Sequence, residues 1–340
     1  MKSKILLLCL VFVFIGGALI FAAGGAQATA KFPSRPINVS VHSGAGGGSD
    51  VWARKVSALM EQQLGVKMIV TNREGGNGGI ASNYVWDQPH DGYNIIGGSE
   101  TAMTYVVNGA FDKNALAWDW LISGGSPGVI VVLNSSPFKT FQDMVDAAKA
   151  HPDTVKVGNS GIGKTWHLKV DMINKYANVP FKHSPYNSSG ASMVALLSKE
   201  VDALSCAAGE AVQYIDSGDV RPLVMTEKEP FTFKKTGNVP AVIDTFPELN
   251  KYLPMNQFLS LMYPNDVPQE VKTVLESAFK KVMESKEMKD FINEQVSVTY
   301  GLSGQPARDM AASMERNFSW FAFDLGLAKV EPTKAVIARP

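Results

Sequence analysis

Cysteine, histidine and unbalanced charge are all scarce in this sequence. Its 340 residues include 2 cysteines and 5 histidines, and 32 basic side chains balance 32 acidic ones, so the net charge is zero. The balanced charge gives no reason to expect nucleic acid as a partner, and no long run of one charge indicates an interaction tail. The histidines lack the spacing of a zinc site, and no G-x-S-x-G motif indicates a serine hydrolase. We therefore expect no metal, no other cofactor and no catalytic residue.

The first 30 residues have the pattern of a secretory signal peptide. Two lysines precede an apolar run over residues 5–21, and residues 28–30 (Ala-Thr-Ala) predict cleavage near Ala30, with residues 26–28 as a second candidate. The alternative is an uncleaved membrane anchor, because the apolar run approaches the length of a membrane span. Cleavage leaves Cys206 as the last cysteine and excludes an internal disulfide. We interpret its side chain as a small buried hydrophobe rather than a nucleophile.

Short apolar strands alternate with amphipathic helices after this segment. Residues 37–41 predict a strand, residues 52–64 a helix and residues 67–71 a second strand, and a similar order recurs after about residue 150. Such alternation predicts an α/β fold in which helices pack on a parallel sheet. After an irregular, proline-rich stretch over residues 228–253, the chain returns as a strand over residues 258–263 with further helices. We therefore expect two α/β lobes, with the second inserted in the first.

A glycine-rich turn connects the first predicted strand to the first predicted helix. Residues 44–48 read Gly-Ala-Gly-Gly-Gly, so backbone N–H groups can approach a ligand there without a Cβ in the way. We expect Ser49 or Asp50 to cap the helix, which places the turn at the positive end of the helix dipole. This arrangement suits an anion. A tight turn that binds no ligand is the alternative.

A second turn, over residues 158–165, fits the G-x-x-x-x-G-K-T pattern of a nucleotide-binding P-loop. That pattern would place Lys164 on phosphates and Thr165 on Mg²⁺. Two observations argue against a nucleotide: the signal peptide directs the chain out of the cytoplasm, and no later apolar strand ends in the expected acidic residue, the nearest candidate being Val201-Asp202. What remains is a second helix N-terminus with a lysine, suited to a smaller anion. An enzyme that binds a nucleotide or phosphate through this turn stays as the alternative.

Several short motifs together resemble one family over the whole mature chain, in order and at matching spacing. They are residues 33–37 (Pro-Ser-Arg-Pro-Ile), 45–50, 72–79, 91–93, 159–161, 167–168, 185–186 and 201–202, and Pro240. In these motifs the chain resembles the Bug-type (TctC-type) periplasmic solute receptors of tripartite tricarboxylate transporters. The resemblance implies a type II periplasmic-binding fold, in which two crossover strands, at about residues 129–133 and 221–226, join two lobes. Lobe 1 would comprise residues 31–130 with 227–340, and lobe 2 residues 131–226.

The same resemblance implies a function and a set of binding residues. It implies a monomeric, non-enzymatic receptor in the periplasm that captures a small organic carboxylate between its lobes and delivers it to the permease subunits in the membrane. In the family, backbone amides, hydroxyl groups and bridging waters hold the carboxylate. By position, the ligand-binding residues would be Ala45, Gly46, Gly47 and Ser49 on lobe 1, and Ser160, Gly161, Lys164 and Thr165 on lobe 2, with Tyr186 and Asn187 nearby.

Departures from the family pattern bear on the identity of the ligand. Ser43 stands beside a turn where the family has an aromatic wall, and Lys164 and Trp166 stand where small hydroxyl residues are usual. We expect Lys164 to pair with a second carboxylate and Trp166 to replace the missing wall. Ala207 stands where the family often has an acidic partner for an amino group. These changes favour a di- or tricarboxylate or an aromatic acid as ligand, and an exported scaffold or sensor is a third interpretation of the whole chain.

Overall fold

The computed structural model describes residues 31–253, 255 and 257–339. The predicted signal segment, with its cleavage site, lies outside the described residues. The compact unit Arg35–Pro340 contains both sheets described below. Within the described ranges, we find no helix that is both long and apolar enough to cross a membrane.

The first sheet has six strands in the order β13-β4-β12-β3-β1-β2. They are β1 (Ile37–Val41), β2 (Met68–Asn72), β3 (Asn94–Ser99), β4 (Trp118–Gly125), β12 (Leu259–Pro264) and β13 (Val298–Leu302). β1 is parallel to β2 and β3, whereas β12 is antiparallel to β3 and β4. Because the carboxyl ends of parallel strands meet at one edge of a sheet, the turns that follow β1 and β3 lie close together.

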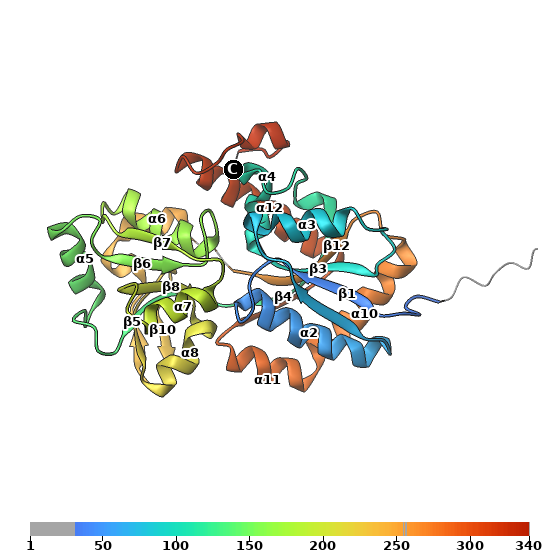
Figure 1. Cartoon of the computed structure of the whole chain (residues 1–340), viewed down its shortest axis with the longest axis horizontal. Coiled ribbons are helices and arrows are strands. Elements are labelled where there is room, and N and C mark those ends of the chain that lie inside the picture. Colours follow the sequence, from blue (N-terminus) through green and yellow to red (C-terminus); the bar gives the residue numbers. More distant parts are fainter. Residues whose placement is uncertain (1–30, 254, 256, 340) are drawn as a thin grey trace, which may run out of the picture. The chain divides into compact units, whose positions relative to one another are not determined.

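The second sheet has five strands in the order β7-β6-β8-β5-β9. They are β5 (Gly128–Leu133), β6 (Lys156–Asn159), β7 (Lys182–Pro185), β8 (Ala203–Ala207) and β9 (Val220–Met225). β6 is parallel to β7 and β8, and β5 is antiparallel to β8 and β9. The predicted α/β fold with two sheet-based halves is confirmed (Figure 1).

The chain passes from the first sheet to the second between β4 and β5, through Ser126 and Pro127. It returns after β9 and re-enters the first sheet at β12. β5 and β9, where we expected the crossovers, pair with each other inside the five-stranded sheet, with Val129 opposite Met225. The first crossing segment therefore directly adjoins β5, whereas residues 226–258 lie between β9 and the return at β12. The proposed lobe boundaries at residues 130 and 226 stay a prediction.

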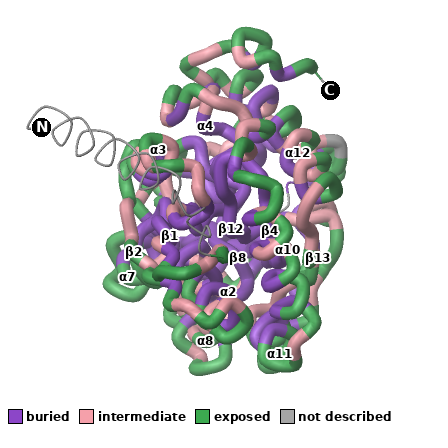
Figure 2. The backbone as a smooth tube through the Cα atoms, turned by 90° about the vertical axis from the view of Figure 1, so that its right-hand side faces the viewer, coloured by how far each residue is buried: buried purple, intermediate pink, exposed green. Residues whose placement is uncertain are grey.

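Helices pack on both sheets. Those beside the six-stranded sheet include α2 (Gly48–Leu64), α3 (Gly79–Trp86), α4 (Tyr105–Asn108), α10 (Gln269–Glu284), α11 (Lys286–Glu294) and α12 (Gly304–Asp324). The helices of the inserted part are α5 (Phe141–Ala150), α6 (Thr165–Tyr176), α7 (Ser189–Leu197) and α8 (Ala208–Ser217). Short 3₁₀ turns are η1 (Gly76–Gly78), η2 (Glu100–Thr104), η3 (Ala115–Ala117), η4 (Pro247–Tyr252) and η5 (Pro332–Ala335). Figure 2 shows β4 and β12 in the buried interior and α8 and α11 with exposed outer turns.

Local sequence signals account for several of these boundaries. α2 buries Trp52, Val56 and Met60, which recur at helical spacing, and it ends at Gly65 in the left-handed conformation (φ 71°). Thr140 caps α5 as predicted, in a capping box with Asp143. Cys206 is buried in β8, in agreement with its interpretation as a small core residue.

The segment over residues 228–253 is more ordered than the sequence predicts. It contains a two-stranded antiparallel sheet, β10 (Phe231–Phe233) with β11 (Gly237–Val239), followed by α9 (Val242–Thr245) and η4. The prediction of an irregular stretch is therefore wrong in part. Its short apolar groups are buried against the rest of the protein, which the local pattern alone does not reveal.

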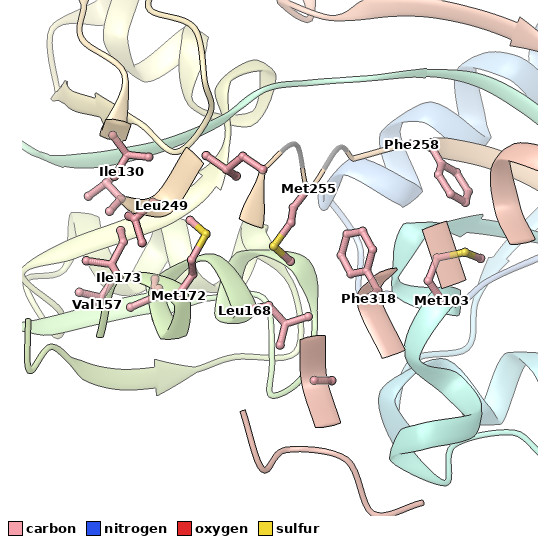
Figure 3. Packing of buried hydrophobic residues seen from close by; sticks show 14 of the residues in the cluster. Met103, Ile130, Val157, Leu168, Met172, Ile173, Leu249, Met255, Phe258 and Phe318 are labelled. Atoms are coloured by element: carbon pink, nitrogen blue, oxygen red, sulfur yellow. The ribbon is translucent and has the colours of Figure 1, made fainter. Parts of the chain in front are cut away.

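The main hydrophobic core is continuous across both sheets. One cluster of buried side chains joins Trp120 and Met262 of the first sheet to Val157 of the second. Figure 3 shows Met255, from the returning segment, with Leu168 on one side and Phe318 on the other. Because this core spans both sheets, we expect the two halves to unfold together.

Candidate ligand-binding site

The first glycine-rich turn leads from β1 into α2, as the sequence predicts. α2 begins at Gly48 with Gly47 as its N-cap residue, which has no side chain that could cap the helix. The prediction that Ser49 or Asp50 caps the helix is therefore wrong. Asp50 lies in the first helical turn, where its Oδ2 accepts a hydrogen bond of 3.0 Å from the amide of Gly46. The amide of Gly46 thus donates its hydrogen bond within the turn region, whereas the amide of Gly48 donates to Glu210, which lies on α8 beside the other sheet.

The second glycine-containing turn leads from β6 into α6. Gly161 and Gly163 have positive φ angles of 127° and 73°, a conformation that favours glycine. Lys164 is the N-cap residue of α6 and is 8 % exposed. Its ammonium group donates a hydrogen bond of 3.4 Å to the carbonyl of Asn187. The turn therefore holds a nearly buried cation at the N-terminus of a helix.

Two acidic side chains connect the helix N-termini of the two sheets. Glu210 of α8 accepts a hydrogen bond of 2.6 Å from the amide of Gly48, the first residue of α2, and one of 3.1 Å from the N-cap amide of its own helix. Glu100 follows β3 and accepts hydrogen bonds from the hydroxyl of Thr165, the first residue of α6, and from the amide of Phe258. Each helix N-terminus thus receives a carboxyl group from the half of the protein that holds the other sheet. We call Glu100 and Glu210 the carboxyl clasp.

The clasp encloses a small cavity of about 30 Å³. It is lined by His42, Ser43, Gly47, Gly48, Ser49, Ser99, Glu100, Thr101, Ser160, Lys164, Trp166, Ser188, Ser189, Glu210 and Gln257. Six of the sequence-predicted binding residues are in this set, namely Ser43, Gly47, Ser49, Ser160, Lys164 and Trp166. A cavity of this size holds about one or two water molecules. It is polar and lies where the first turn, the second turn and the clasp meet.

The other predicted residues lie around this cavity rather than on its wall. They are Ala45, Gly46, Gly161, Thr165, Tyr186 and Asn187. Gly161, Tyr186 and Asn187 line a neighbouring cavity of about 320 Å³, which shares Ser160 and Lys164 with the first. The two residues of the first turn are exposed, and the threonine hydroxyl is bonded within the clasp. The direct binding roles of these six residues stay predictions.

Burial controls the charges of the site. It raises the pKa of Glu100 to about 7, although hydrogen bonds from Thr165 and Phe258 oppose the shift. Burial also raises the pKa of Glu210, and it lowers the pKa of Lys164 against the attraction of nearby glutamates. Burial and the Lys164 charge lower the pKa of His42 to about 3, so this imidazole is neutral near pH 7. Among the residues that line the cavity, Lys164 is then the cationic side chain.

We expect Glu100 to make a contribution to the stability of the protein that falls between pH 5 and pH 8. The pKa of Glu100 is about 7 in the folded chain against an ordinary value of 4.5, so the folded state binds the proton more tightly than the unfolded state does. Ionisation of buried Glu100 lowers the free energy of unfolding. This loss is absent below pH 4.5, is complete well above pH 7 and amounts to about 3 kcal/mol. Glu100→Gln should remove this contribution, so the variant gains stability relative to wild type at pH 8 but not at pH 5.

Urea unfolding of both proteins at the two pH values checks this expectation. Burial also raises the pKa of Glu315 to about 7, far from the cavity on α12, so part of the pH dependence remains in the variant. We therefore compare the free energy of unfolding of the variant with that of wild type at each pH, and ask whether this difference changes from pH 5 to pH 8. A difference that is constant from pH 5 to pH 8 would show that Glu100 does not titrate in this window.

Sequence reasoning missed the residues that arrive from distant parts of the chain. Glu210 lies one helical turn beyond Ala207, the position where the family pattern suggested an acidic group, so a search one turn along the predicted helix would have found it. Glu100 follows the carboxyl end of a parallel strand, a position that commonly faces a ligand site. Gln257 lies in the returning segment, and the sequence carries no signal for its place on the cavity wall.

Comparison with known proteins places these features in a family. The family model for the tripartite tricarboxylate transporter family receptor (TctC) matches residues 52–318. A UPF0065 protein of Cupriavidus necator is 29% identical over 323 residues, which cover 92% of this chain and 95% of that protein.

Solved structures support the same fold. An R. palustris protein with adipate has a TM-score of 0.78 at 22% identity, over 87% of this chain and 99% of that one. MatC from Rhodopseudomonas palustris with bound malate has a TM-score of 0.73 at 20% identity, over 86% of this chain and 100% of that one. At this level of identity the likeness extends to the fold, which is the periplasmic-binding architecture that the sequence predicts.

Proposed function

Because the chain belongs to the tripartite tricarboxylate transporter receptor family, we propose that it is a periplasmic receptor that closes on a small organic carboxylate and delivers it to membrane permease subunits. The observation that supports this most strongly is the polar cavity where two helix N-termini from different sheets meet beside Lys164. Helix N-termini and a lysine each favour a bound anion. Both known ligands named above, adipate and malate, are carboxylates bound by proteins of the same fold.

The cavity also offers hydroxyl groups to a ligand. Ser43 is 8 % exposed, and its Oγ is buried without a hydrogen-bond partner among the described residues. A buried hydroxyl group without a partner is costly, and a ligand oxygen would satisfy it. Ser49 and Ser160 line the same cavity. A carboxylate near Lys164 would thus find a charge and several hydroxyl donors.

Binding requires the two halves to move apart first, because about 30 Å³ cannot hold an organic acid. A ligand that enters must also take over contacts that Glu100 and Glu210 make in this structure. Closure around a ligand bound by both sides is a hinge motion, and the ligand stabilises the closed state by its contacts there.

The ligand proposed here is a small mono- or dicarboxylate, aliphatic or aromatic. Trp166 lines the cavity and can pack against an apolar or planar part of the ligand. Glu100 and Glu210 line the same cavity and would repel additional carboxylates at short range. This repulsion counts against the tricarboxylates that the sequence alone left open.

The nucleotide-binding alternative gains no support from the second turn. A P-loop offers its backbone amides to phosphates. Here the amide of Gly161 donates to the side chain of Asn159, and the amide of Gly163 donates to the imidazole of His167. The hydroxyl of Thr165, which would bind Mg²⁺, donates to Glu100.

A thermal-shift screen of the purified mature protein tests the proposed function. We expect a subset of mono-, di- and aromatic carboxylates to raise the midpoint by several degrees, because only a ligand that binds the native state does so. Nucleotides with Mg²⁺ are the matched comparison, and hits are confirmed by calorimetric titration. Stabilisation by nucleotides without any response to carboxylates would reject the receptor and favour the alternative.

A further inference from the structure

A cluster of two histidines and one aspartate lies on the five-stranded half, apart from the residues that line the two cavities described above. His167 and Asp171 are one helical turn apart on α6, and His183 comes from β7. Because His183 is brought in by the fold, the spacing of histidines along the sequence does not reveal this group. One ligand atom from each of the three residues lies within 4.8 Å of the others.

The two imidazoles face the same carboxylate. His183 Nε2 lies 2.5 Å from Asp171 Oδ1, and His167 Nδ1 lies 3.3 Å from Asp171 Oδ2. The two rings are 4.3 Å apart between centroids. His167 is buried, and the other two side chains are 17 % and 22 % exposed, so an ion can reach the group from solvent.

Contacts within the cluster leave two of its polar atoms without a hydrogen-bond partner. Asp171 Oδ2 and His183 Nδ1 are buried, and neither has a hydrogen-bond partner within the described part of the chain. Each buried polar atom without a hydrogen bond costs free energy of folding, and the histidines and the carboxylate do not remove this cost by themselves. A cation bound to the carboxylate would remove the first of these costs.

We propose that His167, Asp171 and His183 bind a divalent transition metal ion, with Zn²⁺ as the reference ion. Two imidazole nitrogens and one carboxylate oxygen suit borderline metals such as Zn²⁺, Co²⁺ and Ni²⁺ rather than Mg²⁺ or Ca²⁺. Three protein ligands leave a position for water, consistent with the partial exposure of Asp171 and His183. His183 would coordinate as the neutral imidazole, with its proton on Nδ1 and the lone pair of Nε2 directed to the metal.

The metal would connect α6 to β7 close to the second turn. His167 Nδ1 accepts a hydrogen bond of 3.3 Å from the amide of Gly163, and a metal bound at Nδ1 replaces this contact. The site does not include a residue that lines the proposed carboxylate cavity, so it goes beyond the proposed function and can fail without affecting it.

The test uses tag-free mature protein stripped of metal with a chelator. We expect calorimetric titration to give one bound Zn²⁺ per chain, and Co²⁺ to give the visible absorption of a site with nitrogen ligands. His183→Asn and Asp171→Asn should each weaken Zn²⁺ binding at least about tenfold, as loss of a ligand or of its support typically does. Circular dichroism checks that each variant folds.

His90 provides a matched control. Its Nδ1 lies 2.5 Å from Asp266, so it forms a similar histidine–carboxylate pair, but no third ligand is found with it among the described residues. His90→Asn should leave Zn²⁺ binding unchanged. Wild-type protein that binds no Zn²⁺, or folded His183→Asn protein that binds it as tightly as wild type, would overturn the proposal.

Discussion

Carboxylate binding should weaken by about 30-fold or more when Lys164 is replaced by methionine, because loss of one partner of a buried charge pair costs about 2–5 kcal/mol. Lys164 is 8 % exposed and provides the cationic side chain among the residues that line the cavity. Methionine keeps much of the apolar length of the side chain, so the loss reports on the charge. The measurement is calorimetric titration with the best ligand from the thermal-shift screen.

The size of the loss should also depend on the ligand. If Lys164 pairs with a second carboxylate, as its position near the second turn suggests, a dicarboxylate loses more affinity than the matched monocarboxylate. Equal losses would contradict that pairing and leave Lys164 with a single carboxylate. Lys156→Met is the control, because Lys156 is exposed on β6 and lines neither cavity.

The second large effect concerns a buried ion pair beside the chain crossing. Lys169 of α6 is 0 % exposed, and its ammonium group donates to the carboxylate of Glu227 and to the carbonyl of Thr226. Glu227 also accepts a hydrogen bond of 2.8 Å from the amide of Gly128, at the start of β5. Glu227→Ala would leave a fully buried ammonium group without its counter-charge. We expect a loss of about 3–5 kcal/mol in the free energy of unfolding and of about 10 °C in Tm.

A double variant tests whether the loss of stability comes from the unpaired charge of Lys169 or from the lost packing of the Glu227 side chain. Replacement of both partners by Lys169→Met and Glu227→Gln removes the buried charges together, so it should recover much of the stability lost in Glu227→Ala. Urea unfolding of the wild type and of both variants provides the comparison. A single variant within about 1 kcal/mol of wild type would show that the pair contributes no more than a surface salt bridge does.

The fold could be predicted to a large extent because its signals are local. The strand over residues 37–41, the turn after it and the apolar spacing of Trp52, Val56 and Met60 specify the first strand–turn–helix unit without reference to the rest of the chain. The same holds for the unit around Lys164. β4 and β13 were not predicted, since their identity as strands depends on pairing with β12 and with each other rather than on a strong local pattern.

Only some of the residues that line the cavity could be predicted from the sequence. Ser43, Lys164 and Trp166 could be placed there because they lie on or beside the two turns. Glu210 was missed at the family position one turn before it, and its contact with Gly48 joins residues that are 162 positions apart. The expected helix cap failed for a related reason: the carboxylate of Asp50 is held by Arg54 and by the turn that precedes its helix, and a local rule does not weigh these competing partners.

If the protein binds a carboxylate as proposed, the carboxyl clasp acts as an internal competitor for that ligand. In this structure, Glu210 accepts a hydrogen bond from a helix amide and Glu100 accepts one from a helix hydroxyl, and an incoming acid would otherwise use both donors. The measured affinity is then the intrinsic affinity reduced by the fraction of molecules in which these groups are available. A departing acid leaves donors that Glu100 and Glu210 can bind again at once. On the proposed function, release of the acid would therefore be easier than from an anion site without such groups, which suits a protein that passes its ligand on.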